Sequence, residues 1–359
     1  MVLDADTALW MLPDWDEHER IEVVHDRASG LTAIIALHST HLGPGAGGTR
    51  FWHYAEPRGA MRDALRLSQG MSYKNAMAGL PMGGGKAVVV LDKDRTKTPA
   101  MLAAFGDAIE KMGGAYVTAE DVGASVADMV AIRERTGHVC GLPVGEGDAG
   151  GDPGPFTAQG IFLGIKAAVA ERLGKDTLAG VHIALQGCGS VGSGVARRAA
   201  AEGARLVVAD IDENRAKALA SEIGGEAVAA DTIMTTSCDV FSPNALGAVL
   251  TDESIAALDC AIVAGGANNQ LFRPEHGDQL RARDILYAPD YVINAGGIIN
   301  VGLEYVSRRE GRVCPVGEVH DRLEQIPQRL RAIWAESAAS GEGAHQVADR
   351  MARKLIGRG

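Results

Sequence analysis

The sequence predicts a two-domain α/β protein, and three observations lead to that fold class. The chain has 359 residues, enough for two or three domains of ~150 residues each. Its 46% apolar and 23% charged residues are the proportions of an ordinary globular protein rather than of a disordered chain or a coiled coil. Short apolar runs rich in β-branched residues alternate with stretches of helical length, which is the pattern of α/β architecture.

The first half of the chain mixes strand and helix signals. Two β-branched runs flank Ser29 and Gly30 and predict a hairpin. The expected strands are residues 21–25, 31–38, 86–91 and 115–118, and the expected helices are residues 57–77 and 99–112. Residues 141–155, GLPVGEGDAGGDPGP, favour turns and predict a domain boundary or hinge.

The second half predicts a doubly wound parallel sheet with helices on both faces, because its strands are apolar throughout. The expected strands are residues 181–187, 204–210, 226–230, 238–243, 260–266 and 284–297. The chain from about Gly317 onward looks helical, with an expected solvated basic face formed by Arg350, Arg353, Lys354 and Arg358. We therefore predict a first domain of residues 1–146 plus 331–359 and a Rossmann-type domain of residues 147–330.

Charge and composition argue against several classes of protein. A formal charge of −11 disfavours binding to nucleic acid or to an anionic membrane surface. The five cysteines lack CxxC spacing and are expected to be reduced thiols, and we expect no metal site. No apolar run reaches the ~18 to 20 residues of a membrane span, and MVLDADTALW lacks the features of a leader peptide. The sequence thus predicts a cytoplasmic protein whose partners are small molecules.

A dinucleotide site is predicted where the first strand of the second half ends. The motif GCGSVG occupies residues 187–192 and precedes an expected helix, the required context for G-x-G-x-x-G. Its glycines permit a tight turn and close approach to a pyrophosphate, and the binding residues would be Gly187, Gly189, Ser190, Val191 and Gly192. The loop cysteine, Cys188, is expected to be a small packing residue.

The next strand ends in Asp210, where a carboxylate would accept hydrogen bonds from an adenosine ribose. The same negative charge would repel the 2′-phosphate of NADP, so NAD is the expected cofactor. Arg215 is the nearby residue that could instead hold a phosphate.

Two lysines, Lys74 and Lys86, follow glycine-containing stretches in the first half of the chain. A P-loop is not expected, because it needs glycine where this chain has Leu80 and Ser or Thr where it has Ala87. Small and apolar surroundings, together with a second lysine nearby, would lower a lysine pKa. One lysine could then act as a base while the other holds a substrate carboxylate, and Asp121 could stabilise or relay a proton. Exposed lysines beside glycine turns are the alternative that spacing alone leaves open.

Eight segments resemble, in order, signature segments of the leucine, valine and phenylalanine dehydrogenases. They are LGPGAGGTR (42–50), MSYKNA (71–76), LPMGGGK (80–86), TAEDVG (118–123), LQGCGSVG (185–192), CDVFSPNALG (238–247), VAGGANNQL (263–271) and YAPDYVINAGG (287–297). The resemblance to this Glu/Leu/Phe/Val dehydrogenase family runs from about residue 20 to about residue 335. Leucine dehydrogenases are most similar and phenylalanine dehydrogenases come next.

The resemblance implies reversible oxidative deamination of an L-amino acid to its 2-oxo acid and ammonia, with NAD taking the hydride from Cα. It implies that Lys74 holds the substrate carboxylate, that Lys86 activates the attacking water, and that Asp121 handles the amino protons. It further assigns Gly47, Gly48 and Asn294 to substrate binding, and Thr157, Ala267 and Asn268 to cofactor contacts. The first domain would bind substrate and form a homo-oligomer, the second would bind NAD, and a cleft would lie between them.

The substrate side chain is expected in an apolar pocket lined by Ala46, Ala119, Leu323 and Ile326, which would reject Glu, Asp and Lys. This favours branched-chain substrates, while the small Ala46 leaves an aromatic substrate as the alternative. A noncatalytic dinucleotide-sensing protein is disfavoured by the presence of both lysines. A thiol-dependent aldehyde dehydrogenase would need Cys188 or Cys260 in an exposed electropositive site. Asn244 departs from the family pattern, which has a cysteine there.

Overall fold

The computed structural model describes residues 8–94, 96–245 and 247–359 and divides into two compact units. Unit 1 comprises the chain up to Gly151 with residues Asn300–Val316 and Ala352–Gly359, and unit 2 comprises Asp152–Ile299 with Gly317–Met351. Both units combine a β-sheet with helices, so the predicted α/β class is confirmed. Leu246, within the segment CDVFSPNALG, lies outside the described residues.

The C-terminal helices divide differently from the expected domains. Helix α12 (Gln325–Ser340) and α13 (Ala344–Leu355) as far as Met351 belong to unit 2, not to the first domain. One reason is a hydrogen bond of 2.9 Å from the Trp334 ring nitrogen on α12 to the carbonyl of Tyr287. Such a contact joins distant parts of the sequence, which is why local patterns do not predict it.

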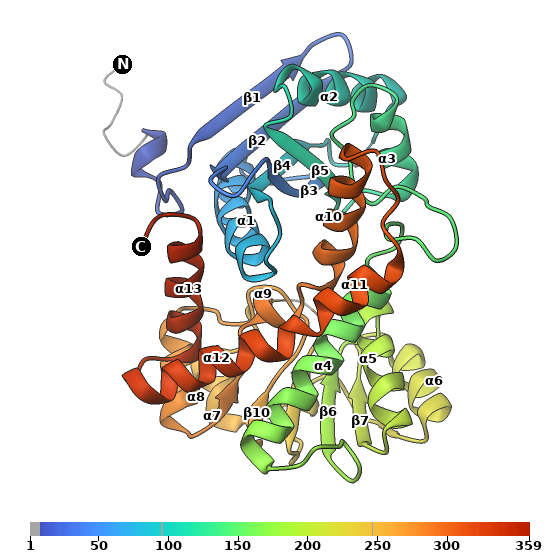
Figure 1. Cartoon of the computed structure of the whole chain (residues 1–359). Coiled ribbons are helices and arrows are strands. Elements are labelled where there is room, and N and C mark those ends of the chain that lie inside the picture. The colour runs from blue at the N-terminus through green and yellow to red at the C-terminus, as the bar shows by residue number, and fades with distance from the viewer. Residues whose placement is uncertain (1–7, 95, 246) are drawn as a thin grey trace. The chain divides into compact units, whose positions relative to one another are not determined.

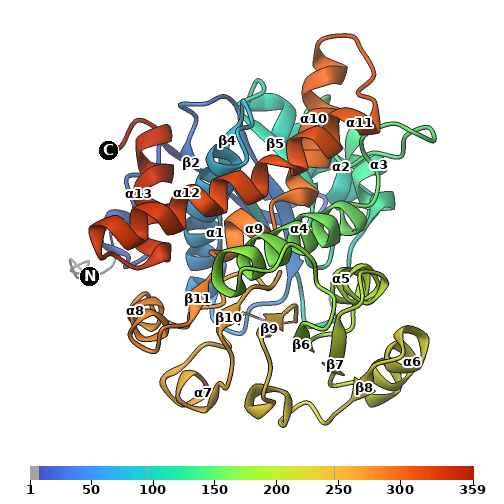
Figure 2. The same ribbon diagram turned by 60° about the horizontal axis from the view of Figure 1, so that its bottom comes forward.

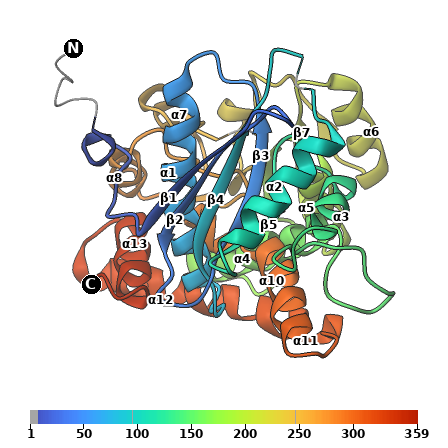
Figure 3. The same ribbon diagram turned by 90° about the horizontal axis from the view of Figure 1, so that it is seen from above.

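Unit 1 contains a mixed sheet of five strands in the order β1-β2-β4-β3-β5 (Figure 3). The predicted hairpin is confirmed, since β1 and β2 pair antiparallel, and β2 pairs antiparallel with β4. Strand β3 lies between β4 and β5 and is parallel to both. The strands are β1 (Arg20–Asp26), β2 (Leu31–Ser39), β3 (Gly45–Trp52), β4 (Gly83–Val90) and β5 (Tyr116–Glu120).

The sequence did not predict β3 or the glycine-rich beginning of β4. Glycine is disfavoured in strands because it supplies no side chain to pack, so GAGG and GGG read as loops. In the structure both stretches lie at the centre of the sheet, and helix α1 (Pro57–Met77), predicted with the correct bounds, packs closely on them. The missing side chains make that close approach possible.

The two faces of this sheet carry different layers (Figure 1). Helix α1 covers one face around Ile34, Ala36 and Val88. Helices α2 (Pro99–Lys111) and α3 (Val126–Arg133) cover the other face, where Phe51 and Phe105 meet edge to face. Side chains along a strand alternate between the two faces of the sheet. Val88 therefore packs on the α1 side, and Phe51 packs on the side of α2 and α3.

The expected solvated face at the C-terminus is wrong for two of its four residues. Arg358 donates to the carbonyl of His38, and its NH1 group lies 2.8 Å from His38 Nε2. Arg353 lies 3.1 Å from Asp16 Oδ2 and 3.2 Å from the Tyr73 hydroxyl. The last residues of the chain are therefore anchored within unit 1.

Unit 2 contains six parallel strands in the order β11-β10-β9-β6-β7-β8, the order of a Rossmann fold. They are β6 (His182–Gln186), β7 (Arg205–Ala209), β8 (Glu226–Ala227), β9 (Val240–Pro243), β10 (Ile262–Val263) and β11 (Leu286–Tyr287). The predicted strand 284–297 is therefore mostly wrong. Pro289 follows β11, and the chain continues as α9 (Asp290–Ile293) and α10 (Gly296–Arg309).

Helices cover both faces of the parallel sheet, as predicted (Figure 2). Helices α4 (Gly154–Leu173) and α5 (Ser190–Ala201) pack together on one face, and α6 (Glu213–Ile223) packs along β7 and β8. Helices α7 (Asp252–Ala257) and α8 (Glu275–Ala282) close the other face, and α11 (Val316–Leu323) precedes α12. The strand order reverses between β6 and β9, where parallel α/β sheets bind ligands.

Two short 3₁₀ helices, η2 (Leu9–Met11) and η3 (Ile233–Thr235), complete the described elements. Among the helices of the described residues, none is both long and apolar enough to span a bilayer.

Candidate active site and dinucleotide site

Lys86 and Asp121 form an ion pair in unit 1. Lys86 lies in β4 and Asp121 directly follows β5, and the lysine Nζ donates to the Asp121 carboxylate. Strand β3 separates them, and its register with both neighbours places Gly48 beside Ala119 and next to Lys86. Because Gly48 has no side chain, the lysine and the carboxylate can meet over β3. A Cβ on Gly48 would lie only 2.8 Å from Asp121 Cβ.

The surroundings shift the pKa of both partners. Lys86 is only 6% exposed, and burial lowers its pKa although Asp121 opposes that shift. Burial alone would raise the pKa of Asp121, but the positive charges of Lys86 and Arg50 outweigh it and lower the pKa to about 2. The sequence predicted a lowered lysine pKa at Lys86, and it is confirmed. The positive charge of Arg50 also contributes to the lowered pKa of Lys86.

Sequence reasoning missed three residues that extend this cluster. Arg50 of β3 lies 3.4 Å from Asp121 through Nε and 2.7 Å from Asp63 of α1 through NH1. The hydroxyl of Tyr54 donates to Asp63 at 2.8 Å. A signal was present in GGTR, because residues two apart in a strand share a face, so Arg50 follows Gly48 on the side of Lys86.

Lys74 lies in the last turn of α1 and is half-buried. The hydroxyl of Tyr116 donates to the carbonyl of Gly47 at 2.7 Å, and a Cβ on Gly47 would lie 3.0 Å from Met71 of α1. Gly47 and Gly48 thus lie between the α1 segment that carries Lys74 and the strand end that carries Asp121. All of these predicted substrate residues belong to unit 1.

The predicted side-chain pocket residues are divided between the two units. Ala46 on β3 is fully buried, and Ala119 on β5 is 8% exposed. Leu323 and Ile326 belong to unit 2, where both are buried. Ile326 packs toward α4, since a Cβ on Gly160 would lie 2.9 Å from its Cδ1.

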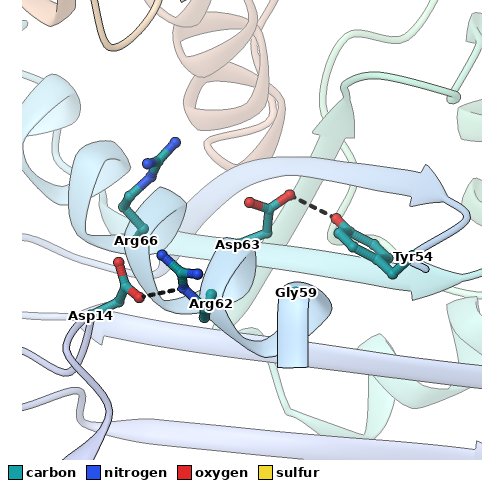
Figure 4. A pocket seen from close by; sticks show the side chains of 6 residues that line it. All are labelled: Asp14, Tyr54, Gly59, Arg62, Asp63 and Arg66. Carbon is teal, nitrogen blue, oxygen red and sulfur yellow. Dashed lines mark hydrogen bonds and ion pairs between the residues drawn. The ribbon is translucent and has the colours of Figure 1, made fainter. Parts of the chain in front are cut away.

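A cavity of about 240 Å³ lies at the N-terminal part of α1 (Figure 4). Arg62 donates to Asp14 at 3.1 Å on one side of it, and Tyr54 donates to Asp63 on the other. Its lining is charged and polar, so it does not fit an apolar side chain. The lining residues are Asp14, Tyr54, Gly59, Arg62, Asp63 and Arg66.

The glycine motif of unit 2 forms the turn between β6 and α5. Gly187 has a φ of +94°, which favours glycine, and a Cβ on Gly192 would lie 1.9 Å from the carbonyl of Gly187. Space in front of Gly189 is open, and Gly189 and Ser190 are exposed. Backbone N–H groups of Ser190, Val191 and Gly192 begin helix α5, an arrangement suited to an anion such as pyrophosphate.

Asp210 follows β7 and is 8% exposed. Its carboxylate accepts from the backbone N–H of Cys188 at 2.7 Å and of Asp212 at 2.9 Å, and it lies 3.5 Å from Arg215. Burial opposes ionisation, but these hydrogen bonds and Arg215 outweigh it and lower the pKa of Asp210. A carboxylate has about four acceptor sites, so capacity for ribose hydroxyls remains.

Asn294 and Asn268 meet beyond the ends of β10 and β11. Asn294 Nδ2 donates to Asn268 Oδ1 at 2.8 Å and to the carbonyl of Gly266 at 3.1 Å. Asn294 Oδ1 is buried without a hydrogen-bond partner among the described residues. An unmatched buried acceptor is costly, which marks this oxygen as a position for a ligand donor.

The remaining predicted cofactor residues lie at the same end of unit 2. The Thr157 hydroxyl donates to the carbonyl of Pro153 at 2.9 Å in the first turn of α4, and Ala267 N–H donates to the carbonyl of Pro243 at 2.9 Å. Asn244, the departure from the family pattern, accepts from the Gly266 N–H at 2.8 Å and so joins the ends of β9 and β10.

Neither Cys188 nor Cys260, the two candidate cysteines of a thiol enzyme, is fully exposed: Cys188 is buried and Cys260 is half-buried. Burial raises the pKa of Cys188 to about 11, and it is 4% exposed, so its predicted packing role is confirmed. The pKa of Cys260 is lowered, chiefly by a hydrogen bond with the Cys238 thiol. Within the described residues, no group of three or more His, Cys, Asp or Glu side chains is arranged to hold a metal ion.

Two family models match the chain. The model of the Glu/Leu/Phe/Val dehydrogenase dimerisation domain matches residues 18–138. The model described as Glutamate/Leucine/Phenylalanine/Valine dehydrogenase matches residues 154–354.

Individual proteins match over nearly the whole length. A leucine dehydrogenase from Thermoactinomyces intermedius is 43% identical over 95% of this chain and 91% of its own. A valine dehydrogenase from Streptomyces albus is 44% identical over 96% of this chain and 93% of its own. The crystal structure of L-tryptophan dehydrogenase from Nostoc punctiforme matches with a TM-score of 0.82 and 36% identity, covering 95% of this chain and 96% of that one.

Proposed function

Because the chain belongs to the Glu/Leu/Phe/Val dehydrogenase family, as its eight segments predicted, we propose that it is an NAD-dependent dehydrogenase of branched-chain, leucine-like L-amino acids. The reaction is reversible oxidative deamination. The amino acid with its ammonium group, NAD⁺ and water give the 2-oxo acid, ammonium ion, NADH and one proton.

The observation that carries this proposal is the ion pair between buried Lys86 and half-buried Asp121 across Gly48. A lysine with a lowered pKa can be neutral at moderately alkaline pH and can then remove a proton. Asp121, whose pKa is lowered to about 2, stays ionised and can bind the substrate ammonium group. Because the charge of Lys86 is a main cause of that low pKa, Asp121 becomes a stronger proton acceptor when Lys86 is neutral. Deamination needs both abilities at neighbouring atoms.

We assign the steps to these residues as follows. Lys74 binds the substrate carboxylate, with Gly47 and Gly48 as backbone partners. Asp121 accepts a proton from the substrate ammonium group, which allows nitrogen to form a double bond to Cα as the hydride leaves. Neutral Lys86 then removes a proton from the water that attacks the resulting imine carbon. Nitrogen receives a proton, and the new hydroxyl group then loses its proton as its oxygen forms the carbonyl double bond, so that the C–N bond breaks and ammonia leaves.

The cofactor we propose is NAD, which supplies the hydride acceptor when bound. The fit rests on the close Gly187–Gly192 turn, the open space before Gly189 and the unmatched Asn294 Oδ1. Arg215 lies 3.5 Å from the Asp210 carboxylate, so it is paired rather than available for a 2′-phosphate, which supports NAD over NADP. Thr157, Ala267 and Asn268 are proposed as further contacts.

Two observations favour a second candidate substrate class, the aromatic amino acids. Ala46 is small, and the L-tryptophan dehydrogenase is a relative by both fold and sequence. The branched-chain assignment is preferred because leucine and valine dehydrogenases are 43% and 44% identical to this chain. Ala46, Ala119, Leu323 and Ile326 remain the proposed apolar lining, and an apolar site would leave the charge of a Glu side chain unpaired.

We also propose a homo-oligomer, since residues 18–138 match a dimerisation domain. Gel filtration with light scattering measures the assembled mass directly, and a monomer would contradict the proposal. The cytoplasmic location stays a prediction from the sequence.

The test is NADH formation, followed by absorbance, with L-Leu, L-Val, L-Phe and L-Glu. We expect the highest kcat/KM for L-Leu or L-Val and no turnover of D-Leu, the matched control. Selectivity between Leu and Val should be modest, because one methylene changes binding by only ~1 to 3 kcal/mol. A preference for L-Phe supports the second candidate, a preference for L-Glu contradicts the apolar pocket, and no NADH with any amino acid contradicts the enzyme.

A further inference from the structure

Arg50 connects the Lys86–Asp121 pair to a second carboxylate. Its NH1 group is 2.7 Å from Asp63, and its Nε is 3.4 Å from Asp121. This Nε is buried and makes no hydrogen bond within the described residues, so it faces the Asp121 carboxylate as an ion pair without a hydrogen bond. The result is an alternating row of charges: Lys86, Asp121, Arg50 and Asp63.

Asp63 is itself held in place. The Tyr54 hydroxyl donates to the same Asp63 oxygen that pairs with Arg50 (Figure 4). Both Arg50 and Asp63 have side chains 24% exposed, so the pair is only partly screened by water. Asp63 lies on α1 and, among the described residues, its ion pair is with Arg50 and its side-chain hydrogen bonds are with Arg50 and Tyr54, not with Lys86 or Asp121.

We propose that Arg50, anchored by Asp63 and Tyr54, is a positioning residue that keeps Asp121 ionised and directed at Lys86. This rests on the proposed function, in which Lys86 and Asp121 exchange protons with substrate and water. Asp121 stabilises the protonated form of Lys86. Arg50 weakens this effect, because the same carboxylate is attracted to both cations. Asp63 favours the protonated form of Lys86, because it competes with Asp121 for Arg50 and so leaves Asp121 more available to Lys86.

A role in binding the substrate carboxylate is less suited to Arg50. Two of its nitrogens already face carboxylates, and both of those partners are fixed by other contacts. The elements packed around Lys86 carry further charged groups, Arg58, Arg62, Arg66 and Lys74 on α1 and Glu120 at the end of β5, but the charges named as shifting the pKa of Lys86 are those of Asp121, Arg50 and Asp63. Arg50 lowers the pKa of Lys86 and Asp63 raises it, behind the larger effects of burial and Asp121.

The experiment compares Arg50→Gln with Asp63→Asn, which should move the pH profile in opposite directions. The rising limb of kcat for L-Leu oxidation reports deprotonation of Lys86. Arg50→Gln removes a cation, so the limb should move to higher pH by about one unit. Asp63→Asn removes an anion and releases Arg50 toward Asp121, so the limb should move to lower pH. Tyr54→Phe should move it in the same direction as Asp63→Asn, by less.

Arg50→Lys is the matched control, because it keeps the charge but cannot bridge two carboxylates. In this variant we expect the rising limb of kcat to lie within about half a pH unit of the wild-type position, and we expect a lower kcat. Shifts of the same sign in Arg50→Gln and Asp63→Asn, or loss of thermal stability with no shift, would mean a merely structural role. A raised KM for L-Leu with an unmoved limb would mean direct substrate binding. Either result overturns the proposal.

A measurement without turnover separates this inference from the proposed function. The rate of reductive methylation of Lys86, followed by peptide mass spectrometry across pH, reports its pKa directly. The same opposite shifts in the two variants are expected even if no amino acid is oxidised. An inactive wild type with these shifts contradicts the function alone, and an active wild type without them contradicts the role of Arg50.

Discussion

A Cβ on Gly84 would lie 2.1 Å from the backbone nitrogen of Ser72. The beginning of β4 thus touches the backbone of α1 two residues before Lys74, and Lys86 follows two residues after Gly84. This contact sets the spacing between the strand that carries the proposed base and the helix that carries the proposed carboxylate ligand.

Gly84→Ala should therefore damage both stability and activity. The added methyl group meets backbone atoms that cannot rotate away, so strand and helix must separate, at a cost on the order of 1–3 kcal/mol. We expect a lower Tm and a raised KM for L-Leu, measured by calorimetry and steady-state kinetics. Gly70→Ala is the control, because a Cβ there has no neighbour within 4 Å and alanine favours a helix. Equal Tm and KM in both variants would contradict this role of Gly84.

The contact between Gly84 and Ser72 illustrates the difference between the parts of the fold that local sequence predicts and the parts that it does not. The hairpin, helix α1 and the strand-glycine-helix turn at Gly187 follow from local patterns, and they were predicted correctly. Strand β3 was not, because its glycines are explained only by the helix and side chains that cross them. Local sequence indicates which backbone conformation a residue favours. It does not show where a side chain must be absent, because that requirement comes from a residue far away in the sequence that packs against the strand.

The candidate site shows the same division. Lys86 and Asp121 could be named from motifs, but their contact depends on Gly48 in a strand between them. Asp63 and Tyr54 carry no motif and join the cluster only through the fold. Arg358, expected to be a solvated cation, binds His38 from the other end of the sequence.

The two proposed lysine roles predict different kinetic defects. Lys86→Ala should lower kcat by at least ~10²-fold with nearly unchanged NAD binding, because a positioned base is lost. Lys74→Ala should chiefly raise KM for the amino acid, because a charge partner of its carboxylate is lost. Lys217→Ala, on the exposed helix α6, is the control for loss of a lysine. Near-normal turnover by the Lys86 variant would rule out its role as the base.

His38 predicts a loss of stability in mild acid. It is fully buried, and burial, followed by the charge of Arg358, lowers its pKa to about 4 although Asp16 opposes this. The unfolded chain gains the proton below about pH 6.5 while the folded chain does not, so stability present at neutral pH is lost as pH falls. Between pH 7 and pH 5 this costs about 2 kcal/mol.

The measurement is Tm at both pH values for wild type and His38→Gln. The decrease in Tm between pH 7 and pH 5 should be smaller in the variant. His25→Gln, at an exposed site beside Thr32, should keep the full decrease of the wild type. The same decrease in all three proteins would mean that other groups cause the acid sensitivity.

Asp210 predicts the choice of cofactor, and the structure determines which substitution tests it. Its carboxylate accepts the Cys188 N–H, so alanine would disturb the glycine turn as well as remove the charge. Asp210→Asn keeps an acceptor and removes the negative charge. We expect a higher KM for NAD and a lower KM for NADP, because a repulsive group disappears together with a hydrogen-bond acceptor.

The matched control is Asp239→Asn. Asp239 accepts a backbone N–H from His182 at 2.9 Å and precedes β9, at the end of the sheet away from the glycine turn. An unchanged ratio of kcat/KM for the two cofactors in Asp210→Asn, or an equal change in both variants, would show that the Asp210 charge does not select the cofactor.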